Sequence, residues 1–191
     1  MAMTLFCVRH GETEWSLSGR HTGVTDIPLT DNGRRQAKEL ASGLDRERIS
    51  LVLVSPLQRA RETCALAGFG DEAIVTPDLA EWNYGEFEGL TTKQIQERNP
   101  GWLLFRDGCP DGETPDQVGA RVDRVIDRAL AANGDVALFA HGHVLRTLAA
   151  RWIDLPAQEG KRFLLDPATL CALGFYREVR AVSVWNTAPA R

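Results

Sequence analysis

The chain has 191 residues, of which 43% are hydrophobic and 25% are charged. These values are typical of one soluble globular domain that is large enough to bury a substantial core. The net charge of −4 argues against a nucleic-acid partner or an anionic membrane surface, because both need a basic excess. Cys7, Cys64, Cys109 and Cys171 are widely spaced and predict neither a zinc site nor a disulfide framework.

Residues 1–8 contain a short apolar run without a charged leader, so they predict a strand rather than a signal peptide. No apolar stretch approaches the roughly 18 residues that span a bilayer. We therefore expect a single cytoplasmic domain over residues 1–191, and a homodimer is one assembly open to it.

Three continuous apolar runs, at residues 4–8, 51–54 and 136–140, each stop abruptly at polar residues. Such runs predict strands that are buried on both faces of a parallel sheet. Residues 170–176 and 181–185 flank a polar turn and predict a closing hairpin.

Helical patterns alternate with these strands, over residues 31–44, from Ser55 onward, from Thr114 onward and over residues 142–153. Thr30 is placed to cap the first helix, and Ser55-Pro56 predicts the N-cap and first residue of the second. The third opens with a capping box at Thr114, and its Leu130 is expected to face inward.

Segment 81–113 is rich in Trp, Gly and Pro and predicts an irregular insertion that covers an active site. Together these patterns predict an α/β fold of three layers, α/β/α. Its sheet is expected to be mostly parallel, with helices on both faces and a small covering insertion.

Polar residues follow each of the three predicted strands. Arg9 and His10 follow the first, Arg59 comes shortly after the second, and His141 follows the third. Because the carboxyl ends of parallel strands meet at one edge of a sheet, we expect these side chains to lie together. Two arginines and two histidines form a pocket suited to a phosphoryl group, and Gly11 is expected to let the backbone approach the ligand.

The chemistry of a phosphate ester explains this set of residues. A dianion repels an ordinary nucleophile, so fixed donors must first neutralise it. A neutral His10 imidazole can then take the phosphoryl group covalently, while His141 stabilises its oxygens. The leaving alkoxide needs a proton, and apolar neighbours of Glu81 are expected to keep that carboxyl protonated. This chemistry requires neither a metal ion nor another cofactor.

These motifs resemble the histidine phosphatase (phosphoglycerate mutase-like) superfamily over nearly the whole chain: Arg9-His10-Gly11-Glu12-Thr13, Ser55-Pro56-Leu57-Gln58-Arg59, Glu81-Trp82-Asn83-Tyr84-Gly85 and Ala140-His141-Gly142-His143. The resemblance implies that His10 is phosphorylated and that Arg9, Arg59 and His141 line the phosphate pocket. It also makes Glu81 the proton donor.

Further substrate contacts follow from the same resemblance, at Ser16, Thr22, Gly23, Tyr84, Gly142 and His143. Ser16 stands where cofactor-dependent mutases usually carry Asn. His143 is compatible with a substrate contact, a helix start or half of a metal site, and metal is least expected because no cysteine or carboxylate completes a ligand set. Tyr84 is as well suited to packing as to binding, and His21 is expected near the entrance.

Residues 81–89, 106–114 and 140–146 look closer to sugar bisphosphatases of the sedoheptulose-1,7-bisphosphatase type than to glycolytic mutases. On that resemblance, Arg106 or Lys93 would hold a second phosphate or a carboxylate. The modest insertion and the short tail favour water as the acceptor, hence a phosphatase acting on a sugar phosphate or bisphosphate. A cofactor-dependent phosphoglycerate mutase and a non-catalytic phospho-ligand binder are the alternatives.

Overall fold

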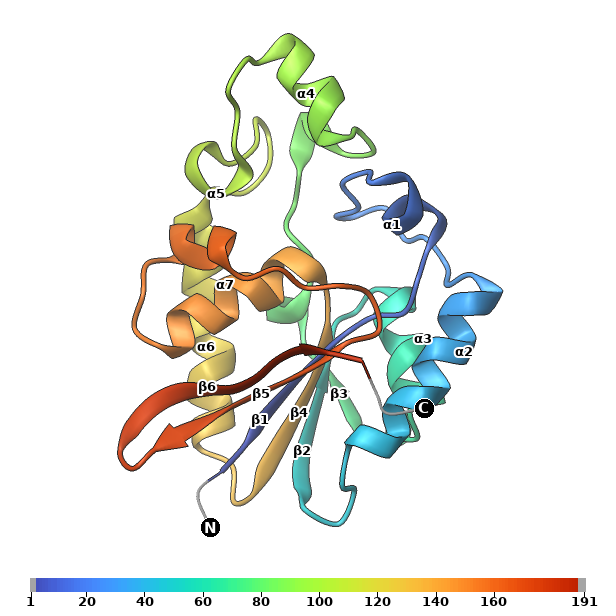
Figure 1. The fold of residues 1–191 in the computed structure, drawn as a ribbon, viewed down its shortest axis with the longest axis vertical. Helices are drawn as coiled ribbons and strands as arrows, with labels where there is room; N and C mark the ends of the chain where they lie inside the picture. Colours follow the sequence, from blue (N-terminus) through green and yellow to red (C-terminus); the bar gives the residue numbers. More distant parts are fainter. Residues whose placement is uncertain (1–2, 189–191) are drawn as a thin grey trace.

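The computed structural model describes residues 3–188, which form a six-stranded sheet in the order β3-β2-β4-β1-β5-β6 (Figure 1). The strands are β1 (Leu5–Arg9), β2 (Ile49–Val54), β3 (Ala73–Val75), β4 (Asp135–Ala140), β5 (Leu170–Tyr176) and β6 (Val179–Thr187). Strands β1 to β4 pair in parallel, whereas β5 pairs antiparallel with β1 and with β6. The three predicted parallel strands and the closing hairpin are confirmed.

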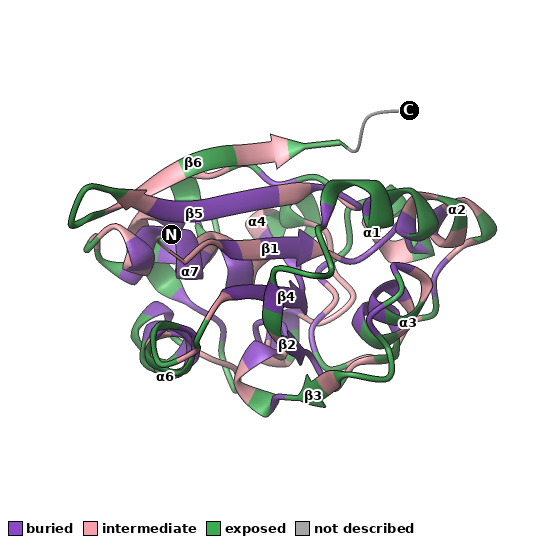
Figure 2. Cartoon of the chain, turned by 90° about the horizontal axis from the view of Figure 1, so that it is seen from below, coloured by how far each residue is buried: buried purple, intermediate pink, exposed green. Residues whose placement is uncertain are grey.

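Helices cover both faces of this sheet (Figure 2). On one face lie α6 (Pro115–Leu130) and α7 (Gly142–Trp152), and on the other lie α2 (Asp31–Glu39) and α3 (Gln58–Leu66). Alternate strand residues supply the two cores, because successive side chains of a strand point to opposite faces. In β1, Leu5 and Cys7 join one core and Val8 joins the other. The predicted α/β/α architecture is confirmed.

The shorter helices are α1 (Glu14–Ser18), α4 (Thr92–Arg98) and α5 (Leu104–Asp107), with 3-10 turns η1 (Leu40–Gly43), η2 (Pro77–Leu79), η3 (Gly85–Phe87) and η4 (Ala157–Arg162). Segment 81–113 stands at the end of the sheet toward which the parallel strands run (Figure 1). It is more regular than predicted, because it contains α4 and α5. Within residues 3–188, no helix is long and apolar enough to cross a membrane.

Two helix caps agree with the sequence and one does not. Thr30 accepts a hydrogen bond from Gly33 N at 2.9 Å, and Thr114 forms the predicted capping box. The helix predicted from Ser55 instead begins at Gln58. The Ser55 hydroxyl is engaged by His141, while Asp26 Oδ1 accepts from Gln58 N at 2.8 Å and caps the helix from another loop.

Leu130 is the second correction. It was expected to face the core, but it is the last residue of α6 and its side chain is 44% exposed. Val118, Val122, Val125 and Ile126 of the same helix are buried as predicted. The predicted apolar face is therefore confirmed along the body of the helix and is wrong only at its last residue.

Candidate active site

The carboxyl edge of the parallel strands brings four of the predicted residues together. Arg9 is the last residue of β1, and His10 and His141 directly follow β1 and β4. The two histidine rings lie 5.1 Å apart between centroids, and Arg59 in α3 donates to His141 at 3.1 Å. We call Arg9, His10, Arg59 and His141 the floor of the site.

His10 is buried, and its surroundings fix its protonation. Its Nδ1 lies 2.7 Å from the carbonyl oxygen of Gly11. A carbonyl only accepts, so Nδ1 carries the hydrogen and the lone pair stays on Nε2. Burial, followed by the positive charges of Arg59 and Arg9, lowers the pKa of His10 well below its ordinary value. The ring is therefore neutral at neutral pH, with a nucleophilic nitrogen available.

His141 is fully buried and carries its hydrogen on the other nitrogen. Arg59 Nε donates to His141 Nδ1, so the hydrogen lies on Nε2, which is 2.7 Å from Ser55 Oγ. Burial, and then the charge of Arg59, lowers the pKa of His141 well below its ordinary value. His141 is thus a neutral N–H donor whose hydrogen is directed to Ser55 Oγ.

Arg59 is fully buried and uses its guanidinium on the protein itself. Nη1 donates to Thr25 O at 3.0 Å, and Nη2 donates to Thr22 O at 3.0 Å and to Gly23 O at 3.1 Å. The geometry therefore gives Arg59 two tasks, which are to hold the loop at residues 22–25 and to orient His141.

The same loop is held from its other side by Glu88. This carboxylate accepts from Gly23 N at 2.9 Å and from Thr25 N at 3.1 Å. Gly23 is required there because a Cβ atom would lie 2.5 Å from Trp82 O. Glu88 is therefore a structural residue of this loop.

Arg9 is the floor cation that remains open to a ligand. Its Nη1 donates to Leu165 O, and its buried Nε has no hydrogen-bond partner among residues 3–188. A Cβ at Gly142 would lie 3.3 Å from Arg9 Cζ, so the glycine lets the guanidinium lie across the start of α7. Arg9 and the N-terminus of α7 thus face the same space.

Gly11 has a different role from the one expected. A Cβ at this position would lie 2.4 Å from Gly33 O, so the glycine permits close packing against α2. Its N–H donates to Thr63 Oγ1 at 3.1 Å. The backbone therefore approaches another segment of the chain, and the predicted approach to a ligand is not what requires glycine.

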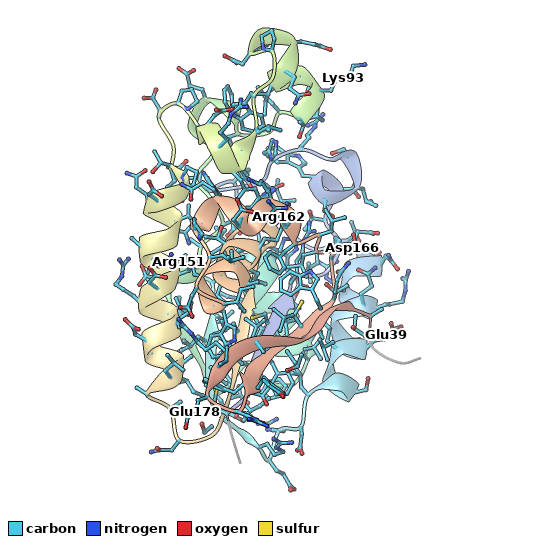
Figure 3. The ribbon with its side chains drawn as sticks, turned by 60° about the vertical axis from the view of Figure 1, so that its left-hand side comes forward. Glu39, Lys93, Arg151, Arg162, Asp166 and Glu178 are labelled. Carbon is cyan, nitrogen blue, oxygen red and sulfur yellow. The ribbon has the colours of Figure 1, made fainter. Side chains whose placement is uncertain are left out.

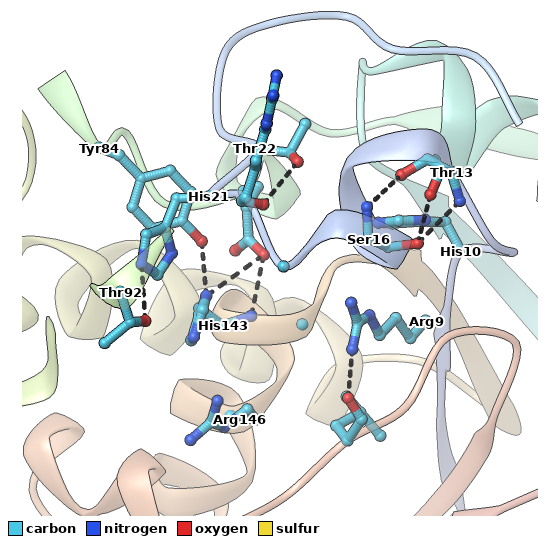
Figure 4. Close-up of a pocket in the computed structure, with 15 residues that line it drawn as sticks. Arg9, His10, Thr13, Ser16, His21, Thr22, Tyr84, Thr92, His143 and Arg146 are labelled. Carbon is cyan, nitrogen blue, oxygen red and sulfur yellow. Dashed lines mark hydrogen bonds and ion pairs between the residues drawn. The ribbon is translucent and has the colours of Figure 1, made fainter. Parts of the chain in front are cut away.

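A cavity of about 250 Å³ lies above the floor (Figure 4). Its walls include eight of the predicted residues: Arg9, His10, Ser16, Thr22, Glu81, Tyr84, Gly142 and His143. Its other lining residues are Thr13, Gly19, Arg20, His21, Thr92, Arg146 and Leu165. Ser16 lines the cavity from α1, where its hydroxyl donates to Thr13 O at 2.8 Å.

Glu81 is buried, and three backbone N–H groups donate to its carboxyl. Its Oε1 accepts from Trp82 N at 2.8 Å and from Val144 N at 2.9 Å, and its Oε2 accepts from His143 N at 3.0 Å. These donors at the start of α7 suit a negatively charged oxygen. Nothing in the sequence indicated these three donors, and the carboxyl reaches the cavity.

Five rings gather on the side of the cavity away from His10, and we call them the aromatic cluster: His21, Tyr84, Trp102, Phe105 and His143. His21 lies 4.8 Å from Tyr84, 5.6 Å from Trp102 and 5.8 Å from His143 between ring centroids. Burial lowers the pKa of His21 to about 4. His21 is thus a packed, neutral residue and not the entrance residue expected from the sequence.

Within the cluster, Tyr84 and His143 are hydrogen-bonded at 2.6 Å. Burial raises the pKa of Tyr84 well above its ordinary value, so its hydroxyl is the donor. Burial, and then the charge of Arg146, lowers the pKa of His143 well below its ordinary value. His143 therefore accepts at Nδ1 and carries its hydrogen on Nε2. His143 lies in the first turn of α7, as one of its predicted roles requires, and it also lines the cavity; the predicted substrate contact stays a prediction.

Arg146 is a cavity residue that sequence reasoning missed. Its Nε donates to Gly160 O at 3.2 Å, its guanidinium lies 4.8 Å from the ring centroid of Phe105, and among residues 3–188 it forms no ion pair. A signal was present, because Arg146 follows His143 by three residues and so shares its helix face.

The two cations named for a second anion lie farther out. Arg106 is ion-paired with Asp107 at 2.7 Å and lines a neighbouring cavity. Lys93 projects from α4 at the outer end of the molecule (Figure 3). In the described part of the chain, no group of three or more His, Cys, Asp or Glu side chains is arranged to hold a metal ion.

A sheet edge that presents the neutral His10 and the guanidinium of Arg9 to one small cavity is suited to phosphoryl transfer. The sequence profile described as "Histidine phosphatase superfamily (branch 1)" matches residues 5–188. The chain therefore belongs to the histidine phosphatase superfamily, as the motifs predicted, and it is a phosphoric monoester hydrolase.

Individual relatives agree with this assignment. The chain is 44% identical over 184 residues to an acid phosphatase of Mycobacterium tuberculosis, covering 94% of this chain and 90% of the relative. It is 38% identical over 184 residues to a sedoheptulose 1,7-bisphosphatase of Saccharomyces cerevisiae, covering 80% of this chain and 68% of the relative. The solved structure of an open reading frame from Mycobacterium tuberculosis superimposes with a TM-score of 0.94 at 42% identity, covering 98% of this chain and 99% of the other.

Proposed function

We propose that the protein hydrolyses a small phosphomonoester through a phosphohistidine on His10. The observation that carries this proposal is the state of His10, whose ring is neutral and hydrogen-bonded through Nδ1, with the Nε2 lone pair free at the cavity. Arg9 and Gly142, the first residue of α7, line the same cavity, and the guanidinium of Arg9 suits the charge of a phosphate dianion.

In the first step, His10 Nε2 attacks phosphorus, the N–P bond forms and the bond from phosphorus to the ester oxygen breaks. The leaving oxygen takes a proton from Glu81, whose Oε2 lies beside the start of α7. In the second step, water attacks phosphorus, Glu81 takes a proton from that water, and the N–P bond breaks to release phosphate. Arg9 donates to the phosphoryl oxygens throughout, and His141 joins it by exchanging its hydrogen bond to Ser55 Oγ for one to the substrate.

Glu81 must be protonated for the first step, although its three backbone donors suit a carboxylate. A phosphate dianion bound at the floor supplies the opposing effect, because two negative groups in one small cavity repel each other. On this account the substrate brings the proton donor into its active form. Because Glu81 gives its proton to the leaving oxygen in the first step, it is able to accept a proton from water in the second.

Water is the proposed acceptor because the relatives named above are an acid phosphatase and a sugar bisphosphatase. The same relatives support a sugar phosphate or bisphosphate as substrate. Arg146 would meet a second anionic group, since it lines the cavity without an ion pair inside residues 3–188. Efficient isomerisation of 3-phosphoglycerate in the presence of 2,3-bisphosphoglycerate would instead make the protein a mutase.

The decisive test compares wild type with His10→Ala, using p-nitrophenyl phosphate in the presence of EDTA. Wild type should turn over the ester, and His10→Ala should lose at least about 10⁴-fold in kcat, because the nucleophile is gone. Acid quenching of wild type with ³²P-labelled substrate should trap an acid-labile, base-stable phosphoenzyme that His10→Ala lacks. Phosphate binding by wild type without hydrolysis of any ester in a sugar phosphate panel would make it a binder.

A further inference from the structure

A second cavity, of about 440 Å³, adjoins the catalytic cavity. His21, Thr92, His143 and Arg146 line both cavities. We propose that this second cavity, the leaving-group chamber, receives an apolar group carried by the alcohol part of the substrate. The inference rests on the function proposed above. It narrows the substrate class to phosphomonoesters that carry an apolar group of about the size of a ring. A sugar phosphate with such a substituent is compatible with both proposals.

The walls of the leaving-group chamber are mainly apolar. Trp102, Leu103, Leu104 and Phe105 follow one another along the chain and all line it. Trp102, Leu104 and Phe105 are buried, whereas the side chain of Leu103 is 50% exposed. An apolar ligand in the chamber would remove part of that leucine from water, which is favourable. A bare sugar has less apolar surface to bury against these walls than an alkyl or aryl group has.

The chamber is preformed because its aromatic walls are fixed. Trp102 Nε1 donates to Gly108 O at 2.8 Å. Phe105 packs edge-on against His143 with centroids 5.6 Å apart. A Cβ at Gly160 would lie 2.5 Å from Phe105 Cε1, so the glycine in η4 makes room for the ring. Because these walls are already ordered, an apolar group can bind without a further entropy cost for ordering the aromatic side chains.

The cations at the rim do not call for an anionic group in the chamber. Arg106 is ion-paired with Asp107 at 2.7 Å, and Lys161 is ion-paired with Glu159 at 2.9 Å. Each of these two charges is thus balanced by an adjacent carboxylate. Arg146, which has no ion pair within residues 3–188, lies at the boundary that the chamber shares with the catalytic cavity. A neutral apolar group fits this rim better than a second phosphate does.

The geometry of the displacement directs the leaving alcohol toward the chamber. In-line displacement places the leaving oxygen opposite the attacking nitrogen. His10 and Ser16 lie on one side of the catalytic cavity, and His143 and Thr92 lie on the other (Figure 4). Glu81 Oε2 accepts from His143 N, so the proposed proton donor stands where the leaving group passes. An alcohol departing from His10 therefore extends past His143 to the chamber.

The test measures the affinity of n-alkyl phosphonates from ethyl to hexyl by calorimetry. Their C–P bond is not hydrolysed, so binding is read independently of turnover. Each methylene buried in the chamber should strengthen binding roughly fourfold. In parallel, kcat/KM is measured for the n-alkyl phosphates, whose alcohols differ little in acidity, and it should rise by the same factor.

Leu103→Ser removes one apolar wall of the chamber and should reduce the gain per methylene to roughly twofold or less. Leu103 is the N-cap of α5 and makes no side-chain cap, so serine is well tolerated there. Leu130→Ser is the matched control, because Leu130 is 44% exposed at the end of α6 and lines neither cavity. It should keep the wild-type series.

Equal affinity for ethyl and hexyl phosphonate would overturn the chamber, as would a wild-type gain that Leu103→Ser retains in full. Hydrolysis of the phosphates combined with a flat phosphonate series would reject the chamber and keep the phosphatase. A rising phosphonate series without hydrolysis of any phosphate would keep the chamber and reject the phosphatase. The two proposals therefore fail separately.

Discussion

The floor and the aromatic cluster face each other across one cavity but are held in different ways. Floor residues are fixed by directional bonds, such as those from Arg59 to His141, Thr22 and Thr25. Cluster residues are held mainly by ring contacts, such as that between His21 and Trp102 at 5.6 Å. Directional bonds set the position of the reacting atoms, whereas ring packing tolerates change. We therefore expect substitutions at the floor to impair the reaction itself, and substitutions in the aromatic cluster to change which substrate is preferred.

The largest effect is expected for Arg59→Met. The change leaves the carbonyls of Thr22 and Thr25 without their donor and frees His141, so the free energy of unfolding should fall by about 3–5 kcal/mol. kcat/KM should fall with it. Urea unfolding and ester turnover measure the two effects. Arg61→Met is the control, an exposed change in the same helix that should alter the free energy of unfolding by no more than about 0.5 kcal/mol. Equal losses in the two variants would contradict the proposed role of the buried Arg59 guanidinium.

Gly11→Ala tests how tightly the floor is packed. The new Cβ would lie 2.4 Å from Gly33 O, a backbone atom that cannot move aside without shifting α2. We expect a loss of about 3 kcal/mol in the free energy of unfolding, measured by urea titration. Gly43→Ala is the control, since its Cβ would meet only the end of the Leu170 side chain, at 3.2 Å. If Gly11→Ala kept the unfolding free energy of the wild type, the backbone at Gly33 would be able to move aside for a Cβ atom.

The pH dependence of stability reports on the aromatic cluster. The pKa of His21 is about 4 in the folded chain, against about 6.5 in an unfolded chain. Between these values the unfolded state binds a proton that the folded state excludes, so stability falls as pH falls through that window. His10, His141 and His143, whose pKa values are also lowered, act in the same direction.

His21→Phe keeps a ring in the cluster and removes one of these groups. Near pH 5 the slope of unfolding free energy against pH should therefore decrease by about 1.4 kcal/mol per pH unit. Urea unfolding at pH 7, 6 and 5 measures both slopes. Parallel curves for the two proteins would mean that His21 titrates alike in the folded and unfolded states.

The sequence predicted the floor far better than the cluster, for a physical reason. Arg9, His10 and His141 come directly after buried strands, and a parallel sheet brings such positions to one edge. The cluster depends on contacts among residues distant in sequence, such as His21 with Trp102, and no local period encodes these. The mistaken helix start at Ser55 has the same origin, because its hydroxyl bonds His141 across the sheet edge.

The smallest effect should come from Tyr84→Phe, which removes one directional bond from an otherwise ring-packed region. The hydroxyl donates to His143 Nδ1 at 2.6 Å, and its loss leaves that nitrogen unpaired, at a cost of about 1 kcal/mol in unfolding free energy. The ring remains, so packing against His21 is kept. Because His143 lines both cavities and loses the bond that orients its ring, kcat/KM should also fall about fivefold, which corresponds to about 1 kcal/mol of transition-state binding. Tyr176→Phe, an exposed change in β5, should alter neither quantity. If Tyr84→Phe lost as much unfolding free energy and kcat/KM as Arg59→Met, the aromatic cluster would be as rigid as the floor. The difference between directional bonds and ring packing would then not explain which residues carry the chemistry and which select the substrate.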